Sequence, residues 1–237
     1  MLEDGALAHP TEGTPQGGSI SPLLANVYLH YVLDAWLATE VAPRMTGRIA
    51  LVRFADDFVL IIEHERDAER ILEVLPKRFG RYGLALHPEK TKRVRFARPR
   101  RAGGPDRGAG PGTFDFLGFT HHWGKSRKGA WVVRRRTAAS RQRRAINKVW
   151  RWCRGHRHDP IPEQRQTLAA KLHGHYGYYG MTGNFEALRS FHREVLRAWK
   201  QWLDRRGAPQ ALAWDKWRKF LERMSLPRPR IVVSHAR

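Results

Sequence analysis

The spacing of apolar residues changes along the chain from a mixture of helical and strand patterns to a helical pattern alone. Before residue 137, short apolar runs of strand length lie between two stretches of helical spacing, 21–38 and 67–82. Apolar residues three and four positions apart indicate one face of a helix, whereas short runs rich in Val, Ile and Phe favour strands. Beyond Thr137 the spacing is helical throughout. The pattern predicts an α+β fold in which an all-helical bundle follows a mixed region.

Each of the two early helices has a predicted apolar face. The first helix is expected to begin with Ser21 as its N-cap and Pro22 as its first helical residue. The second contains Pro76, which has no backbone N–H and is expected to distort the helix. The face of the first helix consists of Leu23, Leu24, Val27, Tyr28, Tyr31 and Trp36, and that of the second of Ile71, Leu72, Leu75 and Phe79.

Strands are predicted where short apolar runs are bounded by turn residues. The runs 49–52 and 58–62 flank a short turn, so they predict a β-hairpin. The segment 98–112 is rich in Gly, Pro and Arg, and predicts a flexible loop and a candidate domain boundary. Further short strands are expected at 83–86, 93–96, 114–119 and 130–133.

The helical region after Thr137 has three predicted apolar faces and ends in a Pro/Arg tail at 227–237. We expect Trp199, Trp202, Trp214 and Trp217 to lie in the core, because the first pair keeps helical spacing with other apolar residues. The three faces are Ile146, Val149, Trp150 and Cys153; Leu168, Leu172, Tyr176 and Tyr179; and Phe185, Leu188, Phe191, Val195, Trp199 and Trp202.

Composition is that of a globular protein. Of the 237 residues, 41% are hydrophobic, which is enough to build a core. No apolar run reaches the length of a membrane span, and the first residues lack a signal-peptide pattern, so no membrane partner is expected. The single cysteine excludes an internal disulfide and is typical of a reducing compartment. These features predict a cytoplasmic protein.

Charge is distributed very unevenly. Residues 1–89 hold 8 Lys or Arg against 13 Asp or Glu, whereas residues 90–237 hold 36 against 9. The stretch 116–158 contains 13 Lys or Arg, four Trp and no acid. Cations that pair with phosphates and flat rings that stack on bases are typical of nucleic-acid grooves. The asymmetry therefore predicts nucleic-acid binding; the alternative is a solvated basic surface.

Two adjacent carboxylates, Asp56 and Asp57, occupy the turn of the predicted hairpin. Mg²⁺ prefers oxygen ligands and commonly bridges carboxylates to substrate phosphates. In nucleotidyl transfer, two such ions can clamp the attacking and leaving oxygens. The pair is therefore a candidate metal site. The alternative is an ordinary turn, in which Asp is also a favoured residue.

Several motifs follow one another in a fixed order. The stretch 13–26 reads GTPQGGSISPLLAN, and 53–57 reads RFADD. GLAL at 83–86, which precedes Lys90, FDFLGF at 114–119 and KLHGHYGYYG at 171–180 come next. In this order the motifs closely resemble the reverse transcriptases encoded by bacterial group II introns, and the resemblance covers nearly the whole chain.

The resemblance implies part of a right-hand polymerase. Residues 1–97 correspond to the C-terminal half of the palm, built from antiparallel hairpins with packed helices. The loop 98–112 is followed by primer-grip-like strands at 113–136. Residues 137–226 correspond to a helical thumb and maturase-specific bundle, and 227–237 to the tail.

The resemblance also assigns roles to the residues that match its motifs. Asp56 and Asp57 are the expected catalytic ligands of Mg²⁺, and Phe54 stands where the family usually has Tyr. Lys90 matches a lysine near the nucleotide phosphates, where an ammonium can neutralise charge or donate a proton. The residues expected to contact the incoming nucleotide and the template are Pro15, Gln16, Gly17 and Gly18, although an ordinary loop before a helix is the alternative.

Two further groups are expected to contact nucleic acid. Phe116, Leu117 and Gly118 resemble the turn that grips the primer; a core strand is the alternative. Intron RNA would be read through its shape and phosphates rather than its bases. The expected RNA-binding residues are Arg134, Arg135, Arg136, Arg141, Arg143 and Arg144.

The implied activity is that of an RNA-directed DNA polymerase, a nucleotidyltransferase. It would extend a primer held in an RNA/DNA primer-template, using Mg²⁺ and dNTPs, and would bind group II intron RNA to assist splicing. In the family, another catalytic aspartate lies on a strand upstream of the TPQGG loop, and only twelve residues precede Gly13 here. We therefore expect the chain to be the C-terminal part of such a polymerase, to which an upstream fragment could supply the fingers. The alternatives are a non-catalytic RNA-binding maturase fragment and a remnant without function.

Overall fold

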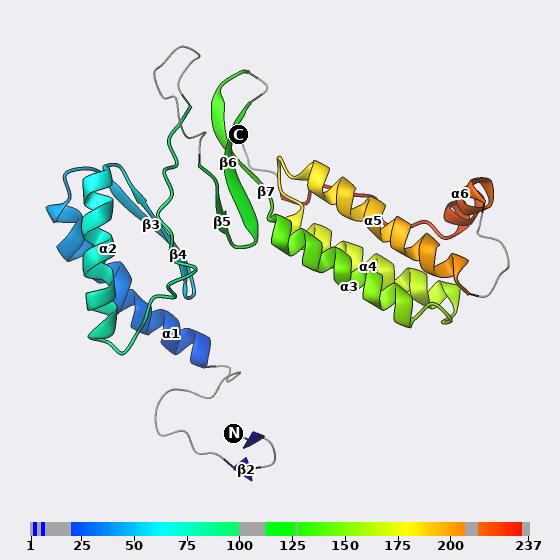
Figure 1. Cartoon of the computed structure of the whole chain (residues 1–237), viewed down its shortest axis with the longest axis horizontal. Coiled ribbons are helices and arrows are strands. Elements are labelled where there is room, and N and C mark those ends of the chain that lie inside the picture. The colour runs from blue at the N-terminus through cyan, green and yellow to red at the C-terminus, as the bar shows by residue number, and fades with distance from the viewer. Residues whose placement is uncertain are drawn as a thin grey trace. The chain divides into compact units, whose positions relative to one another are not determined.

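The chain divides into two compact units, Met1–Val94 and Arg95–Arg237 (Figure 1). The computed structural model describes residues 2–3, 6–7, 20–99, 112–126, 128–206 and 213–233. Helices and small antiparallel sheets occur together, as an α+β fold requires. The predicted fold class is thus confirmed at this level.

The first unit consists of helical segments and two short hairpins. The strand β3 pairs with β4 over six residues, from Ile49 opposite Ile62 to Phe54 opposite Asp57. This is the predicted hairpin, with a turn shortened to two residues. The elements are β1 (Leu2–Glu3), β2 (Ala6–Leu7), α1 (Ser21–Leu29), η1 (His30–Ala35), η2 (Leu37–Val41), η3 (Ala42–Arg44), β3 (Ile49–Phe54), β4 (Asp57–Ile62) and α2 (Glu65–Gly80).

The core of the first unit lies between the helical segments and one face of the β3–β4 hairpin. Helix α2 contributes Ile71, Leu75 and Phe79, as predicted, whereas Leu72 is exposed. Pro76 lies inside α2 without ending it. The other buried side chains are Val32, Leu33, Trp36, Leu37 and Val41.

The apolar face predicted for the first helix is wrong. Except for Trp36, its predicted members are exposed, because the helical path continues beyond α1 and buries residues further along the chain. The helix also begins one residue earlier than predicted. Ile20 is the N-cap and Ser21 is already helical, so Pro22 is the second helical residue.

Asp67 joins α2 to the loop before β3. Its buried carboxylate accepts hydrogen bonds from the Thr46 N–H at 3.0 Å, the Thr46 hydroxyl at 2.8 Å and the Gly47 N–H at 3.0 Å. Burial opposes the charged form of Asp67, but the three hydrogen bonds outweigh it and lower the pKa of this carboxyl. The bonds fix the entry of the chain into β3.

No strand forms at 83–86 or 93–96, in contrast to the prediction. Gly83 has a φ of +65°, and the Leu84 N–H donates to the Phe79 carbonyl, so this segment terminates α2 instead. Leu84 and Leu86 then pack against the core of the first unit. Their apolar pattern therefore reflects packing rather than strand pairing.

The second unit begins with a three-stranded antiparallel sheet, in the order β5 (Phe114–Phe116), β6 (Phe119–Lys125) and β7 (Trp131–Thr137). The predicted single strand at 114–119 is a hairpin that turns at Leu117 and Gly118. The strand predicted at 130–133 extends to Thr137. Phe96, which precedes the sheet in sequence, stacks on Trp123 with ring centroids 5.4 Å apart.

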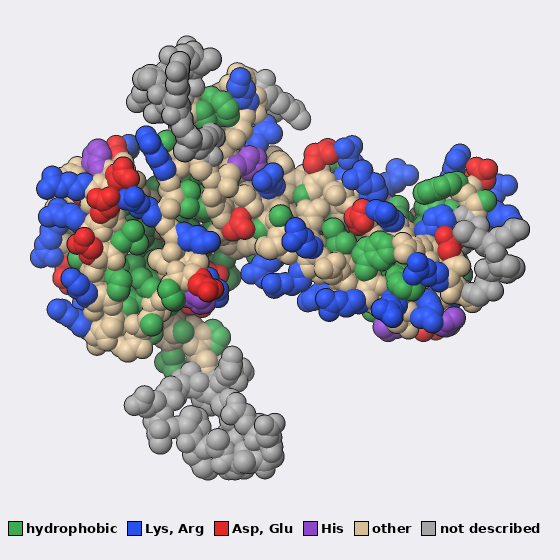
Figure 2. Space-filling view, in the orientation of Figure 1, with side chains coloured by type: hydrophobic (Ala, Val, Ile, Leu, Met, Phe, Trp, Pro, Cys, Tyr) green, Lys and Arg blue, Asp and Glu red, His purple; other side chains and the backbone are tan. Residues whose placement is uncertain are grey.

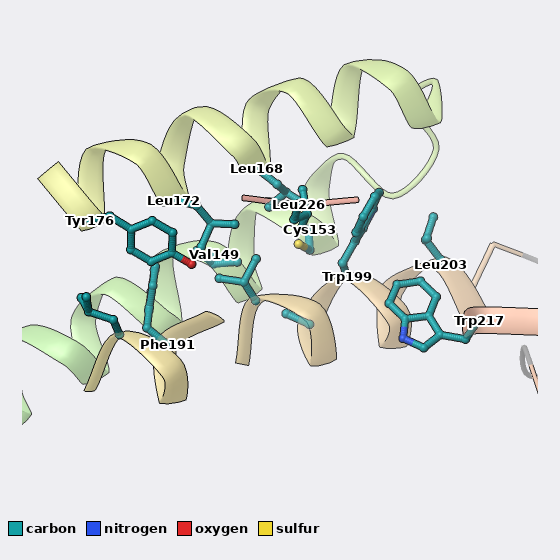
Figure 3. Close-up of a cluster of buried hydrophobic side chains, with 13 residues drawn as sticks. Val149, Cys153, Leu168, Leu172, Tyr176, Phe191, Trp199, Leu203, Trp217 and Leu226 are labelled. Carbon is teal, nitrogen blue, oxygen red and sulfur yellow. The ribbon is translucent and has the colours of Figure 1, made fainter. Parts of the chain in front are cut away.

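Helices α3 (Ala139–Gly155), α4 (Ile161–Tyr179), α5 (Phe185–Asp204) and α6 (Trp214–Arg223) form the bundle. Figure 3 shows its core, in which Leu168, Leu172 and Trp199 are fully buried. Trp217 is also buried and Trp202 partly so, as predicted, but Trp214 is 73% exposed and does not belong to the core.

The segment 225–233, which we call the strap, runs along α4. The Arg165 side chain donates to the Ser225 carbonyl near the start of α4, and the Tyr176 hydroxyl donates to the Pro227 carbonyl. Past the end of α4, the Gly180 carbonyl accepts from the Val232 and Val233 N–H groups. The predicted tail is thus part of the folded unit as far as Val233, and its last four residues lie outside the described part.

Candidate catalytic hairpin and nucleic-acid surface

The tip of the β3–β4 hairpin is a two-residue turn made of Ala55 and Asp56. Ala55 has a φ of +52°, in the left-handed region that a residue with a Cβ rarely adopts. Asp57 is the first residue of β4 and pairs with Phe54. Because members of a cross-strand pair project from the same face, Asp57 lies on the face of Phe54. That face is open, since Phe54 is 66% exposed.

Both carboxylates are exposed, and neither forms a hydrogen bond or ion pair with the residues that the structure describes. The other face of the hairpin packs on the core, where Phe58 contacts Phe79 with ring centroids 6.1 Å apart. The short turn thus presents two free carboxylates on a supported hairpin. Such a pair can coordinate a divalent cation whose remaining positions are filled by water and phosphate oxygens.

Arg53 ties this turn to the helices. Its Nε donates to Asp34 Oδ1 at 2.8 Å and its Nη2 to Asp34 Oδ2 at 2.6 Å. Its Nη1 donates to Asn26 Oδ1 at 2.9 Å and to the Ala55 carbonyl at 3.0 Å. The hydrogen bond to Asp34 is the main cause of the raised pKa of the Arg53 guanidinium.

The structure describes only some of the other residues that are predicted to surround the nucleotide. Lys90 is exposed in a turn, where its N–H donates to the His87 carbonyl. Its side chain has no ion-pair partner among the described residues of the chain. Pro15, Gln16, Gly17 and Gly18 lie outside the described residues, so their role stays a prediction.

The predicted primer-grip segment is a tight turn held by α4. Leu117 and Gly118 have φ values of +49° and +76°. The Tyr178 hydroxyl donates to the Leu117 carbonyl at 2.9 Å. A Cβ at Gly118 would lie 3.0 Å from the Tyr179 hydroxyl and would also require left-handed backbone, so glycine suits this position on both counts.

Asn184 joins the end of β7, which lies next to this turn, to the helical bundle. Its Oδ1 accepts from the Thr137 N–H at 2.8 Å, and its Nδ2 donates to the Thr137 hydroxyl and the Tyr179 carbonyl, both at 2.8 Å. Next to Thr137, the Ala138 N–H donates to the Gly118 carbonyl. One buried amide thus connects the end of β7 with the end of α4 and the start of α5.

The three consecutive arginines of β7 do not form one surface, because neighbouring strand residues project from opposite faces. Arg134 and Arg136 are exposed on one face, and Arg134 extends over Gly124. Arg135 is half-buried on the other face, opposite His121. The pKa of His121 is lowered mainly by burial, and to a smaller extent by the positive charge of Arg135.

Helix α3 has a continuous basic face. The helix contains six Lys or Arg and no Asp or Glu. Ion pairs of these cations are absent from the described part of the chain. Figure 2 shows Lys and Arg side chains over the helices of this unit. The side chains that border an open hollow on α3 are Ser140, Arg143, Arg144, Asn147, Lys148 and Arg151.

Several functional candidates were missed by the sequence reasoning. Arg53 and Asn26 stand inside the quoted motifs, but no role was derived for them, and Asp34 lies outside those motifs. Lys148 and Arg151 continue the face of Arg144 at intervals of four and three residues, so helical periodicity could have identified them.

The described part of the chain contains no group of three His, Cys, Asp or Glu residues that could hold a metal ion by itself. Asp56 and Asp57 would therefore share a cation with ligands from another source, such as substrate phosphates. No helix in the described ranges is long and apolar enough to cross a membrane. A cytoplasmic location stays a prediction.

An exposed carboxylate pair on a supported hairpin, in a chain with a strongly basic helical unit, is typical of metal-dependent nucleotidyl transfer. Comparison with known protein families also points to nucleotidyl transfer. Residues 7–121, a little under half of the chain, match the family described as reverse transcriptase (RNA-dependent DNA polymerase). The match includes the carboxylate hairpin, Lys90 and the turn at Leu117 and Gly118. Curated proteins gave no match to the chain.

The match supports a relation to reverse transcriptases, a family of RNA-directed DNA polymerases whose members act as nucleotidyltransferases on a template-primer and dNTPs. Members of this family generally use divalent metal ions. The exposed oxygens of Asp56 and Asp57 fit such an ion, because oxygen is the donor type that it prefers.

Proposed function

We propose that the chain is part of a reverse transcriptase of the group II intron type and carries its Mg²⁺-binding hairpin. Asp56 and Asp57 hold the metal, Lys90 assists at the nucleotide phosphates, and residues 15–18 line the nucleotide pocket. The observation that carries the proposal is the exposed, unpaired carboxylate pair on a supported hairpin inside the region that matches reverse transcriptases. The group II assignment is supported by the order of the sequence motifs.

In this function, the protein's own residues position the reactants. The bound cation supplies charge neutralisation at the phosphates and activation of the primer hydroxyl. The turn at Leu117 and Gly118 would support the primer end, and Tyr178 holds that turn against α4. Further carboxylate oxygens are needed to complete a two-ion site, because one turn cannot hold both ions.

The test is primer extension on an RNA template with Mg²⁺ and dNTPs, performed with the full chain and with Asp56→Ala. Any extension that the chain supports, alone or with an upstream fragment that supplies the missing carboxylate, should be lost in Asp56→Ala, because a metal ligand is gone. Glu63→Gln is the matched control, since it removes a carboxylate from the other end of the same hairpin. Equal extension by Asp56→Ala and Glu63→Gln would contradict the metal assignment.

A second candidate is a non-catalytic maturase that binds and stabilises folded intron RNA. The basic face of α3 favours it, because that face needs no catalytic hairpin to bind phosphates. RNA binding without extension by the wild-type chain would support this candidate. Extension that depends on Asp56 would show that the chain is more than an RNA-binding protein.

A further inference from the structure

We propose that Arg53 is a positioning residue for the carboxylate turn, and that Asp34 supplies the counter-charge that keeps Arg53 from competing with the metal. Arg53 would hold the Ala55–Asp56 peptide so that both carboxylates face the substrate side of the hairpin. This inference rests on the proposed metal-binding role of Asp56. It assigns a role to two residues whose side chains do not touch substrate.

The geometry of the guanidinium supports a positioning role. Four hydrogen bonds leave its three nitrogens, two of them in the bidentate arrangement that matches guanidinium to carboxylate. The acceptors belong to α1, to η1 and to the turn itself. The Arg53 side chain is only 13% exposed, and its two bonds to Asp34 are partly buried. The turn is thereby connected to two segments that lie 19 and 27 residues earlier in the chain.

Ala55 explains why the turn needs such support. The left-handed backbone conformation is unfavourable for a residue with a Cβ, because the Cβ crowds the backbone. Arg53 donates to the carbonyl of this same residue, at 3.0 Å. The bond fixes the peptide plane that leads into Asp56, and therefore the direction in which the Asp56 side chain leaves the backbone.

Electrostatics explain why Asp34 is part of the arrangement. A guanidinium three residues before Asp56 could pair with that carboxylate or repel a divalent cation beside it. Asp34 accepts from two of its nitrogens at 2.8 and 2.6 Å, which directs the positive charge toward the helices. In the described structure, both carboxylates of the turn are left without an ion-pair partner.

The experiment uses the full chain and two readouts. Hydrogen exchange of a peptide that covers 54–58 reports on the turn, and Mn²⁺ titration followed by electron paramagnetic resonance reports on the metal site. Arg53→Lys keeps the charge but removes the planar fork. We expect its turn to exchange about tenfold faster, and its Mn²⁺ affinity to fall by about 10–100-fold, as when a ligand loses its supporting hydrogen bonds.

Arg48→Lys is the matched control. Arg48 pairs with Glu63 at the opposite end of the same hairpin, and its side chain is 93% exposed. We expect wild-type exchange at 54–58 and wild-type Mn²⁺ affinity in this variant. Asp34→Asn keeps the shape of the Arg53 partner without its charge, and should weaken Mn²⁺ binding because the guanidinium is no longer neutralised.

Each outcome decides a separate question. Unchanged exchange at 54–58 in Arg53→Lys overturns the positioning role, whatever happens to the metal. Faster exchange with unchanged Mn²⁺ affinity overturns the link between the turn and the metal site. Mn²⁺ binding that survives Asp56→Ala contradicts the proposed function instead, and the exchange readout still decides the role of Arg53. If Arg53→Lys does not fold, Asn26→Ala removes one anchor from an exposed helical position, and should speed exchange by a smaller factor.

Discussion

At the scale of single residues, His175 is a basic side chain packed among aromatic rings. Its ring stacks on Phe191 with centroids 3.8 Å apart and lies 4.7 Å from the ring of Tyr179. Its buried Nε2 has no hydrogen-bond partner in the described part of the chain. Burial lowers the pKa of His175 to about 4. The imidazole is therefore neutral in the folded protein at neutral pH.

This burial predicts a loss of stability in mild acid. The unfolded chain takes up a proton at this histidine below about pH 6.5, whereas the folded chain resists it until about pH 4. The free energy of unfolding should therefore fall as the pH drops through this window. His175→Phe keeps an aromatic ring on Phe191 and removes the titration, so it should reduce the fall by about 2 kcal/mol.

The measurement is urea unfolding at pH 7, 5.5 and 4.5. His173→Phe is the control, because His173 is exposed on the same helix and carries the same change of side chain. Its stability should follow the wild-type pH dependence. Identical pH profiles for the two variants would contradict a specific contribution of His175.

The residue scale also shows where sequence reasoning ends. Asp56 and Asp57 could be predicted at a turn, because polar residues between two strand-like runs mark one. The left-handed conformation of Ala55 and the hydrogen-bond partners of Arg53 could not be predicted from the sequence. No local rule selects Asp34 or Asn26 as acceptors for a guanidinium so far along the chain. The contacts of Arg53 with Asp34 and Asn26 depend on how α1 and η1 pack against the hairpin.

At the scale of elements, the sheet of the second unit is joined to the bundle by Asn184. Thr137 and Asn184 are both almost fully buried, and their hydrogen bonds connect β7, α4 and α5. Removing one partner of a buried hydrogen bond leaves the other group unsatisfied at a cost of about 1–3 kcal/mol. Asn184 serves three such groups at once.

Asn184→Ala should therefore reduce the free energy of unfolding by about 3 kcal/mol, since the Thr137 N–H and the Tyr179 carbonyl lose their partner. Chemical denaturation monitored by tryptophan fluorescence measures this change. Asn147→Ala is the matched control, because Asn147 is exposed on α3, and it should alter stability by less than about 0.5 kcal/mol. Similar losses in the two variants would rule out the special position of Asn184.

Prediction of the elements succeeded where apolar periodicity coincided with long-range packing. Helix α2 and the bundle helices bury most of their predicted faces, because these stripes have one large partner surface. The first helix did not follow this rule. Most of its apolar residues before Val32 are exposed, and periodicity alone cannot show which of two apolar stretches meets the core. Likewise, Leu84 and Leu86 have a strand-like spacing but pack after a helix end.

At the scale of the whole molecule, positive charge is concentrated after residue 89, and part of it forms the basic face of α3. Arg144, Lys148 and Arg151 are exposed along one side of this helix, without ion-pair partners among the described residues. By contrast, Arg189, Arg197 and Arg218 pair with acidic residues three positions earlier. The two groups have equal charge but unequal freedom to bind phosphate.

Replacing Arg144, Lys148 and Arg151 together with Ala should weaken RNA binding and reduce the slope of log K against log salt by about 2–3, because each phosphate contact contributes about 0.7–0.9. The dissociation constant is measured at several salt concentrations. The control replaces Arg189, Arg197 and Arg218 with Ala, which removes the same charge. Equal slopes for both triple variants would show that RNA responds to net charge and not to the α3 face.

The strap has a consequence for how the protein is made. It lies along α4 and ends beside Gly180, so residues that are synthesised about fifty positions apart must meet. Leu226, which belongs to the strap, is one of the buried side chains of the bundle. While the chain emerges from the ribosome, the groove that receives Leu226 stays open until the strap has been translated. The second unit can therefore reach its native packing only after the strap has been synthesised and has left the ribosome, and a chain that ends within α6 would leave part of the bundle core uncovered.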